Sequence, residues 1–230
     1  MKEKIKVIAF DADDTLWINE PYFQETENKF CHLLENYLPH NSTSQELFHT
    51  EMKNLQLYGY GVKGFMLCMI ETITKICDKN PNFDLINKTI ELGHELLNKP
   101  VVLLGGVEET LSKLNEKYKL VMATKGDLLD QQRKLKKSGL ESYFHHIEIM
   151  SEKKVNDYDR LLKLLDCNSE NFLMVGNSIK SDIIPVLELQ SYAAHIPYHT
   201  TWAHEVHEQK LEHRNFYELK NISEILNYLN

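Results

Sequence analysis

The sequence has few of the features that mark secreted, membrane or nucleic-acid-binding proteins. Its four cysteines form no Cys-x-x-Cys pair, which favours reduced thiols over a disulfide framework. No long apolar run of the signal-peptide kind follows the charged N-terminus, and no window approaches a membrane span. Lysine and arginine number 26 against 34 acidic residues, so the net charge is -8, without a basic block. We therefore expect a cytoplasmic protein that binds neither membranes nor nucleic acids.

The length and the order of the sequence patterns predict an α/β protein. A chain of 230 residues with 42% apolar content suits one large domain or a core with an inserted module. Segment 4–10 is apolar and β-branched, as expected of a parallel strand covered on both faces. Beyond residue 100, strand and helix patterns alternate, which predicts a parallel sheet with right-handed crossovers. The expected strands are 119–123, 147–150, 171–175, 191–196 and 216–219, and the expected helices are 107–117, 128–137, 157–165, 179–189 and 222–229.

Residues 18–99 carry helical patterns and no strand signal. The expected helices are 21–37, 44–58, 62–79 and 84–97. Apolar residues are dense in 65–76, as in the central helix of a small bundle. The predicted fold is thus a doubly wound, Rossmann-like, mostly parallel sheet formed by 1–17 and 100–230, with an all-helical insert at 18–99.

Two carboxylates, Asp11 and Asp13, follow the first strand at its carboxyl end. Ligands of open α/β sheets bind at that edge, so these acids stand where chemistry is expected. A helix cap would explain one aspartate but not the pair. Further polar residues follow later strands: Thr124 and Lys125, then Lys153 and Lys154, then Gly176, Asn177 and Asp182. Taken singly, these residues also fit a helix cap, a solvated lysine pair and a turn.

Asp11-x-Asp13-x-Thr15, Thr124, the lysine pair and Gly176-Asn177 with Asp182 together resemble the four ordered motifs of the haloacid dehalogenase superfamily. The commonest members of that superfamily are magnesium-dependent phosphohydrolases. Members with a helical cap between the first two motifs share the layout described above, and the resemblance covers nearly the whole chain. It implies that 18–99 is a cap domain that selects the substrate. This sequence departs from the pattern at Asn177, where an aspartate is typical.

The resemblance also implies roles for the motif residues. Asp11 would be the nucleophile that forms an aspartyl-phosphate, and Asp13 the general acid and base. Thr124 and Lys153 would stabilise the phosphoryl oxygens, and Lys125 is also assigned to substrate binding. Lys153 is chosen because it lies five residues before an aromatic residue, with Lys154 as the near alternative.

The implied cofactor is Mg²⁺. Its ligands would be Asp11, the backbone carbonyl of Asp13, and Asp182 with Asn177, directly or through water. The amide at Asn177 weakens the electrostatic attraction for a cation. The expected activity is hydrolysis of a phosphoric monoester of a small phosphorylated metabolite. Asp13 argues against halide displacement, because that branch lacks the second acid. A phosphomutase and a catalytically weak binding or regulatory protein remain alternatives.

Two further groups of residues have weaker interpretations. Four residues near the glycines between two expected helices are specificity candidates: Tyr58, Tyr60, Lys63 and Phe65. Five histidines crowd the segment from His195 to His213, but their spacing lacks the i, i+4 pair of a metalloprotease helix. We expect no structural metal there.

Overall fold

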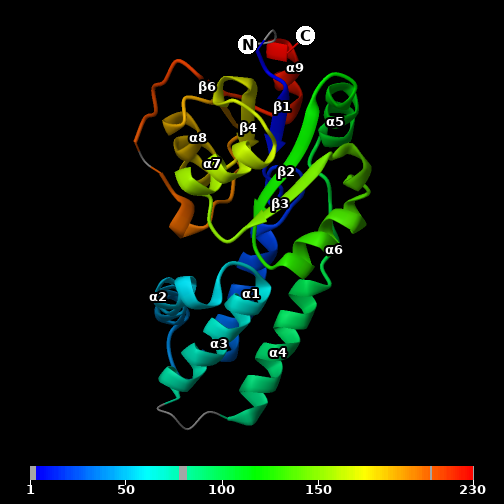
Figure 1. The fold of residues 1–230 in the computed structure, drawn as a ribbon. Coiled ribbons are helices and arrows are strands. Elements are labelled where there is room, and N and C mark those ends of the chain that lie inside the picture. Colours follow the sequence, from blue (N-terminus) through cyan, green and yellow to red (C-terminus); the bar gives the residue numbers. More distant parts are fainter. Residues whose placement is uncertain (1–3, 78–81, 208, 230) are drawn as a thin grey trace. The chain divides into compact units, whose positions relative to one another are not determined.

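The chain divides into two compact units. The computed structural model describes residues 4–77, 82–207 and 209–229. The α/β unit comprises Met1–Glu20, Val101–Lys125 and Gln131–Asn230, and the helical unit comprises Pro21–Pro100 and Gly126–Asp130. Figure 1 shows the sheet within the first unit and the helices of the second.

The α/β unit is built on a six-stranded, all-parallel sheet in the order β3-β2-β1-β4-β5-β6. The strands are β1 (Val7–Phe10), β2 (Lys119–Lys125), β3 (His146–Met150), β4 (Phe172–Gly176), β5 (Tyr192–His195) and β6 (Phe216–Glu218). The predicted doubly wound, Rossmann-like sheet is therefore confirmed. The strand order reverses between β1 and β4, and the crevice at the carboxyl ends of these strands is where such sheets bind ligands.

Both faces of the sheet are covered. Ile8 and Phe10 of β1 join one apolar cluster, whereas Val7 and Ala9 join another, as the two-residue period of a strand requires. Helices α5 (Val107–Asn115), α6 (Leu128–Ser138) and α9 (Leu226–Leu229) contribute to the first cluster, and α7 (Val155–Leu164) and α8 (Ile184–Glu188) to the second (Figure 1). This double burial explains why β1 is apolar at every position.

Two expected helices have a different form in the structure. Segment 179–189 was expected to be one helix, but a π-helical turn, Ile179–Ile183, precedes the short helix α8. Segment 222–229 begins as a 3₁₀ turn, Ile222–Ile225, before α9. The π-turn carries Asp182, one of the predicted metal ligands.

The helical unit contains α1 (Glu20–Leu33), α2 (His40–Tyr58), α3 (Val62–Ile76) and α4 (Phe83–Leu97). Helix α3 has the buried face expected of a central helix, with Cys68, Met69 and Ile73 in the apolar cluster of this unit. Helix α1 ends at Leu33, four residues before its predicted end at Tyr37. Helix α2 begins at His40, directly after Pro39 and four residues before its predicted start at Ser44. The predicted end of the third helix, 78–79, lies outside the described residues.

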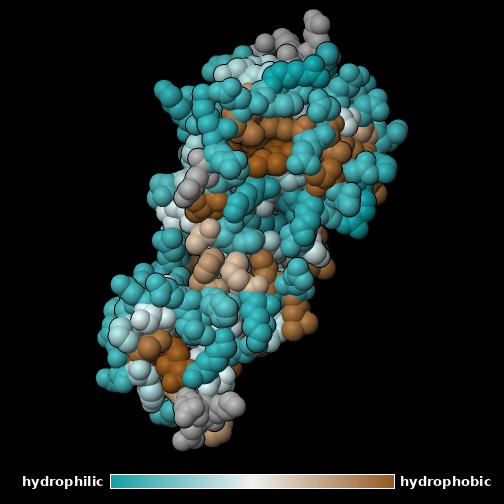
Figure 2. All heavy atoms as spheres, turned by 90° about the vertical axis from the view of Figure 1, so that its left-hand side faces the viewer, coloured by the Kyte–Doolittle hydropathy of each residue, from teal (hydrophilic) through white to brown (hydrophobic). Residues whose placement is uncertain are grey.

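The face of the molecule shown in Figure 2 is largely polar. In Figure 2, hydrophilic residues cover most of the visible face, and hydrophobic residues form separate patches. Within the described segments, no helix combines the length and the apolar character that a membrane crossing needs.

Candidate active site

The first predicted acid lies at the point where the sheet order reverses. Asp11 follows β1 directly, and its backbone N–H donates to the Val175 carbonyl of β4 at 2.9 Å. This hydrogen bond continues the parallel register of β1 and β4 by one residue. The side chain of Asp11 therefore emerges next to the loop that follows β4, which holds Asn177 and Asp182.

A buried lysine joins two of the predicted acids. The Lys153 Nζ atom lies 2.5 Å from Asp11 Oδ1 and 2.7 Å from Asp182 Oδ1. The exposed fractions of the three side chains are 1% for Lys153, 10% for Asp11 and 1% for Asp182. Lys154, by contrast, is 71% exposed. The structure thus brings Lys153 into the cluster and leaves the alternative, Lys154, in solvent.

Burial and the neighbouring charges act against each other on the pKa values of Asp11 and Lys153. Burial raises the pKa of Asp11 to about 7, with Lys153 opposing the shift and Asp182 adding to it. Burial also disfavours the charged form of Lys153, yet the two carboxylates outweigh it and raise the pKa of this ammonium above its usual value. Lys153 is therefore positively charged at neutral pH. Its charge favours the ionised carboxylate that a nucleophile at Asp11 requires.

Oxygen atoms suited to a hard cation converge beside Asp11. Thr15 Oγ1 donates to Asp11 Oδ2 at 3.0 Å. With the Asn177 amide turned so that its nitrogen faces this group, that nitrogen lies 3.2 Å from Asp11 Oδ2 and 3.2 Å from the Asp13 carbonyl oxygen. The opposite amide orientation presents the oxygen of Asn177 at the same place, where Thr15 donates to it at 3.1 Å.

These donors fit Mg²⁺, which is bound by oxygen ligands and retains several waters. Asp11, the carbonyl of Asp13 and Asn177 could hold it. Among the residues described, no group of three or more His, Cys, Asp or Glu side chains is arranged to bind a metal. A cation here would therefore depend on the carbonyl and the amide as well as on Asp11.

Asp182 is fixed by hydrogen bonds to both of its carboxylate oxygens. Oδ1 contacts Lys153, and Oδ2 accepts the backbone N–H of Ser178 at 3.0 Å. Gly176 makes this position possible, since a Cβ atom there would lie 2.3 Å from Asp182 Oδ2 and 2.6 Å from its Cβ. The glycine of the fourth motif therefore leaves room for the acid that follows it.

Gly176→Ala should displace Asp182 and reduce the free energy of unfolding by about 1–3 kcal/mol, because the new methyl group overlaps a buried side chain. Urea unfolding would measure this change. Gly105→Ala is the matched control, because its Cβ would meet nothing within 4 Å. Equal stabilities for the two variants would contradict the steric role of Gly176.

Asp13 is held by three donors. Its Oδ1 accepts from Trp17 Nε1 at 2.7 Å and from Lys134 Nζ at 2.6 Å, and its Oδ2 accepts from Gln131 Nε2 at 2.9 Å. These contacts fix the position of the Asp13 carboxylate. The four-residue spacing of Trp17 was a possible signal in the sequence, but no pattern marked Gln131 or Lys134.

Thr124 and Lys125 end β2, as predicted. The buried Thr124 hydroxyl accepts from Gln131 Nε2 at 2.9 Å, so Gln131 links Thr124 to Asp13. The oxygen Oε1 of Gln131 is buried and has no hydrogen-bond partner within the described chain, which leaves an acceptor beside these groups. Lys125 donates to Ser181 Oγ at 2.9 Å and to Glu205 Oε1 at 2.6 Å. Its ammonium is thus committed to two protein groups.

Asp14, the variable position of the first motif, joins the loop after β1 to the start of α1. Its backbone is left-handed, with φ of 62°. Its carboxylate accepts the backbone N–H groups of Asn19 and Glu20, each at 2.9 Å, at the start of α1. Burial raises its pKa to about 7, opposed by these two hydrogen bonds. No sequence pattern indicated this role.

The specificity candidates of the helical unit have varied surroundings. The Tyr58 hydroxyl donates to Glu71, and Phe65 packs against Phe23 with ring centroids 5.4 Å apart. Lys63 pairs with Asp127 at 3.0 Å, and Tyr60 lies in the bend between α2 and α3. The contacts of Tyr58 and Phe65 account for these two residues by packing within the unit.

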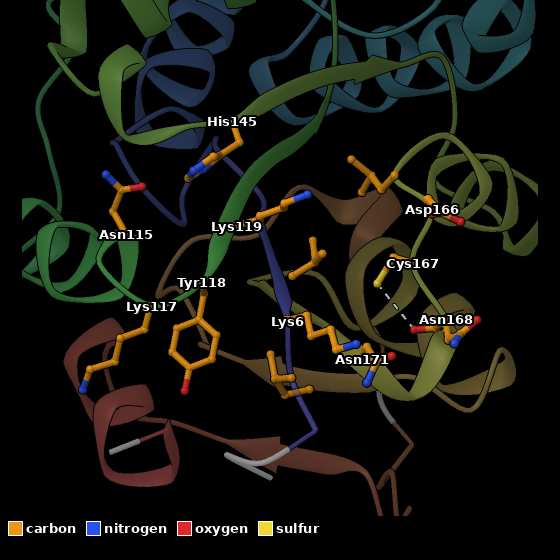
Figure 3. A pocket seen from close by; sticks show the side chains of 13 residues that line it. Lys6, Asn115, Lys117, Tyr118, Lys119, His145, Asp166, Cys167, Asn168 and Asn171 are labelled. Carbon is orange, nitrogen blue, oxygen red and sulfur yellow. Dashed lines mark hydrogen bonds between the residues drawn. The ribbon is translucent and has the colours of Figure 1, made fainter.

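A cavity of about 450 Å³ lies at the opposite, amino-terminal edge of the sheet (Figure 3). It contains none of the predicted site residues. Its lining consists of Ile5, Lys6, Val7, Asn115, Lys117, Tyr118, Lys119, His145, Leu165, Asp166, Cys167, Asn168 and Asn171. The position follows from Val7 and Lys119, which are the first residues of β1 and β2. This cavity is therefore separate from the acidic site.

Comparison with known proteins places the chain in a family. A family model of haloacid dehalogenase-like hydrolases matches residues 5–186, and the chain belongs to this family. A haloacid dehalogenase-like family hydrolase of Xanthomonas campestris is 34% identical, with a TM-score of 0.88 over 98% of this chain and 92% of that chain. No curated protein matches the chain.

Two more distant structures share the fold. A predicted phosphoglycolate phosphatase of Haemophilus somnus 129PT is 18% identical, with a TM-score of 0.66 over 99% of both chains. A 2-haloacid dehalogenase of Pseudomonas syringae pv. tomato DC3000 is 17% identical, with a TM-score of 0.66 over 98% of both chains. The fold alone therefore accommodates different reactions, and the site must distinguish between them.

Proposed function

We propose that the protein is a magnesium-dependent phosphatase that hydrolyses a small phosphoric monoester through an aspartyl-phosphate on Asp11. The observation that carries this proposal is the buried cluster of Asp11, Lys153 and Asp182 at the switch point of the sheet. Asp13 supports a phosphatase over a dehalogenase, because it supplies a second acid two residues after the nucleophile. The cluster thus combines a nucleophile, a fixed cation and a proton-transfer group.

In the proposed reaction, an oxygen of Asp11 attacks phosphorus and the alkoxide leaves. Lys153 and the Thr124 hydroxyl stabilise the charge on the phosphoryl oxygens. Bound Mg²⁺ would supply the positive charge that lets two anions approach each other. Asp13 protonates the leaving oxygen and later accepts a proton from the water that attacks the phosphorus of the aspartyl-phosphate. This attack breaks the bond between phosphorus and the Asp11 oxygen, releases inorganic phosphate and restores Asp11. To carry that proton, Asp13 must give up a contact with Trp17, Gln131 or Lys134.

The remaining parts of the proposal concern the cap, the class of substrate and the cellular compartment of the protein. We assign residues 18–99 the role of a cap that selects the leaving group, with Lys63 and Tyr60 as the residues to test. The substrate would be a phosphorylated metabolite rather than a nucleic acid or a membrane lipid, in keeping with the net charge of -8. All four cysteines are free thiols, which supports a reducing compartment such as the cytoplasm.

A panel of phosphorylated metabolites, assayed for free phosphate with and without Mg²⁺, tests the proposal. We expect steady release that stops when EDTA removes the metal. Isomerisation of a sugar phosphate with little release would instead identify a mutase. Halide release from a 2-haloacid would identify a dehalogenase, and inactivity on every substrate would favour a binding or regulatory protein.

Asn177→Asp should raise the affinity for Mg²⁺ but lower the stability of the metal-free protein. A carboxylate is a stronger ligand, so we expect about tenfold tighter Mg²⁺ binding. Without metal, the new charge would repel Asp11 and the amide donor would be lost, costing about 1–3 kcal/mol. Calorimetry and urea unfolding would measure the two effects. Asn168→Asp adds the same charge at an exposed site, and equal Mg²⁺ affinities for the two variants would contradict the role of Asn177.

A further inference from the structure

The histidine-rich segment after β5 contacts the loop that carries Asn177 and Asp182. His195 Nε2 lies 3.0 Å from the Asn177 carbonyl oxygen, and Lys180 Nζ donates to the His204 carbonyl at 2.9 Å. Both contacts involve residues of the segment 195–205, which sequence patterns left without a role. The segment therefore contacts the loop near both of its ends.

Glu205 contacts the side chains of Lys125, Ser178 and Ser181. Ser178 Oγ donates to Glu205 Oε2, and Ser181 Oγ donates to the same oxygen at 2.8 Å. Lys125 Nζ, at the end of β2, donates to Glu205 Oε1 at 2.6 Å. One carboxylate thus links the end of β2 to two positions of the loop after β4.

The serines that Glu205 holds lie next to the residues expected to bind the cation. Ser178 follows Asn177, and its backbone N–H donates to Asp182. Ser181 precedes Asp182, and its carbonyl accepts the hydroxyl of the buried Tyr158 at 3.0 Å. A shift of either serine would move a neighbouring ligand, because each is joined to it through the backbone.

The Glu205 carboxylate is strongly held in its ionised form. The exposed fraction of its side chain is 14%, and that of Lys125 is also 14%. Burial opposes ionisation of Glu205, but Lys125 and the serine hydroxyls lower its pKa to about 2. A partly buried ion pair whose carboxylate also accepts from two serine hydroxyls has a restricted geometry, which suits a positioning role.

We propose that Glu205 is a positioning residue of the site, whose carboxylate holds the loop from Asn177 to Asp182 in the geometry that Mg²⁺ binding needs. This inference rests on the proposed function. It also gives Lys125 a new role. Its ammonium, which the resemblance assigned to substrate binding, also anchors Glu205 to the end of β2.

The test is direct measurement of Mg²⁺ binding by calorimetry, without substrate. Glu205→Gln keeps the size of the side chain and removes its charge, so we expect about tenfold weaker binding, as for other groups that orient metal ligands. Glu212→Gln removes the same charge from an exposed side chain of the connection between β5 and β6, and its affinity should stay within about twofold of the wild type. An unchanged affinity in Glu205→Gln would overturn the proposal.

The Mg²⁺ dependence and the kcat of Glu205→Gln distinguish a positioning role of Glu205 from a direct role in the reaction. In Glu205→Gln, the Mg²⁺ concentration for half-maximal activity should rise about tenfold, while kcat at saturating Mg²⁺ stays within about threefold. Loss of kcat with unchanged Mg²⁺ dependence would overturn the positioning role. If Glu205→Gln does not fold, Ser181→Ala decides: it removes one donor to the carboxylate, and an unchanged Mg²⁺ affinity would overturn the proposal.

The wild-type measurements distinguish this proposal from the proposed function. If the protein binds Mg²⁺ but hydrolyses no phosphate ester, the phosphatase proposal fails, and calorimetry on Glu205→Gln still decides the role of Glu205. If the wild-type protein binds no Mg²⁺ at millimolar concentrations, the positioning role is overturned, whatever reaction the protein catalyses.

Discussion

Lys153→Met should leave the protein inactive and lower its free energy of unfolding by about 3–5 kcal/mol. The cause is the position of Lys153 between Asp11 and Asp182, both of which lose their buried cation in the variant. Without that cation, the two carboxylates repel each other or must take up protons. Urea unfolding in metal-free buffer and phosphate release with Mg²⁺ would measure the two effects.

Lys154→Met is the matched control for this prediction. It removes the same charge one residue away, from a side chain in solvent. Its stability should stay within about 0.5 kcal/mol of the wild type, with activity retained. A similar loss of stability in both variants would show that general charge, rather than the buried cluster, matters.

Asp11→Asn should also abolish phosphate release, by at least about 10⁴-fold, but with little loss of stability. An amide cannot form the aspartyl-phosphate, which explains the loss of activity. Because burial already raises the pKa of Asp11 to about 7, a neutral side chain fits this place at little cost. Lys153 keeps its second partner, Asp182. The two cluster variants would thus be equally inactive but differ in stability.

Steady-state assays and urea unfolding measure this contrast. Asp159→Asn is a suitable control, because Asp159 makes an exposed pair with Lys163 on α7 and should retain full activity. Substantial turnover by Asp11→Asn would remove Asp11 from the role of nucleophile. In that case Asp13 or an activated water would have to perform the attack.

Sequence patterns predicted the parts of this protein that depend on local periodicity. The sheet follows from alternating apolar segments, and β1 is apolar throughout because both of its faces are buried. Asp11 and Lys153 were predicted from their positions after strands, and the structure brings them to 2.5 Å. All strands of this sheet are parallel, so their carboxyl ends lie at one edge, and the alternation of strands and helices in the sequence carries this information.

The residues that hold Asp13 and Lys125 could not be predicted in this way. Gln131 and Lys134 lie on a helix whose sequence shows only ordinary surface polarity, although both reach Asp13. Glu205 lies in an irregular segment without a period. Contacts of this kind depend on the course of the chain between helices and strands. The spacing of apolar residues predicts the helices and strands themselves but not this course. The π-turn at Asp182 escaped prediction because its composition is that of an ordinary helix.

The central place of β1 has a consequence for how the chain folds during synthesis. Its neighbours are β2, which starts at Lys119, and β4, which starts at Phe172, so this apolar strand is made long before either partner. At typical translation rates, a gap of roughly 110 residues corresponds to about 5–20 seconds. The helical unit is nearly continuous in sequence and can form its local contacts in that interval. The nascent chain must therefore keep β1 from aggregating until β2 leaves the ribosome.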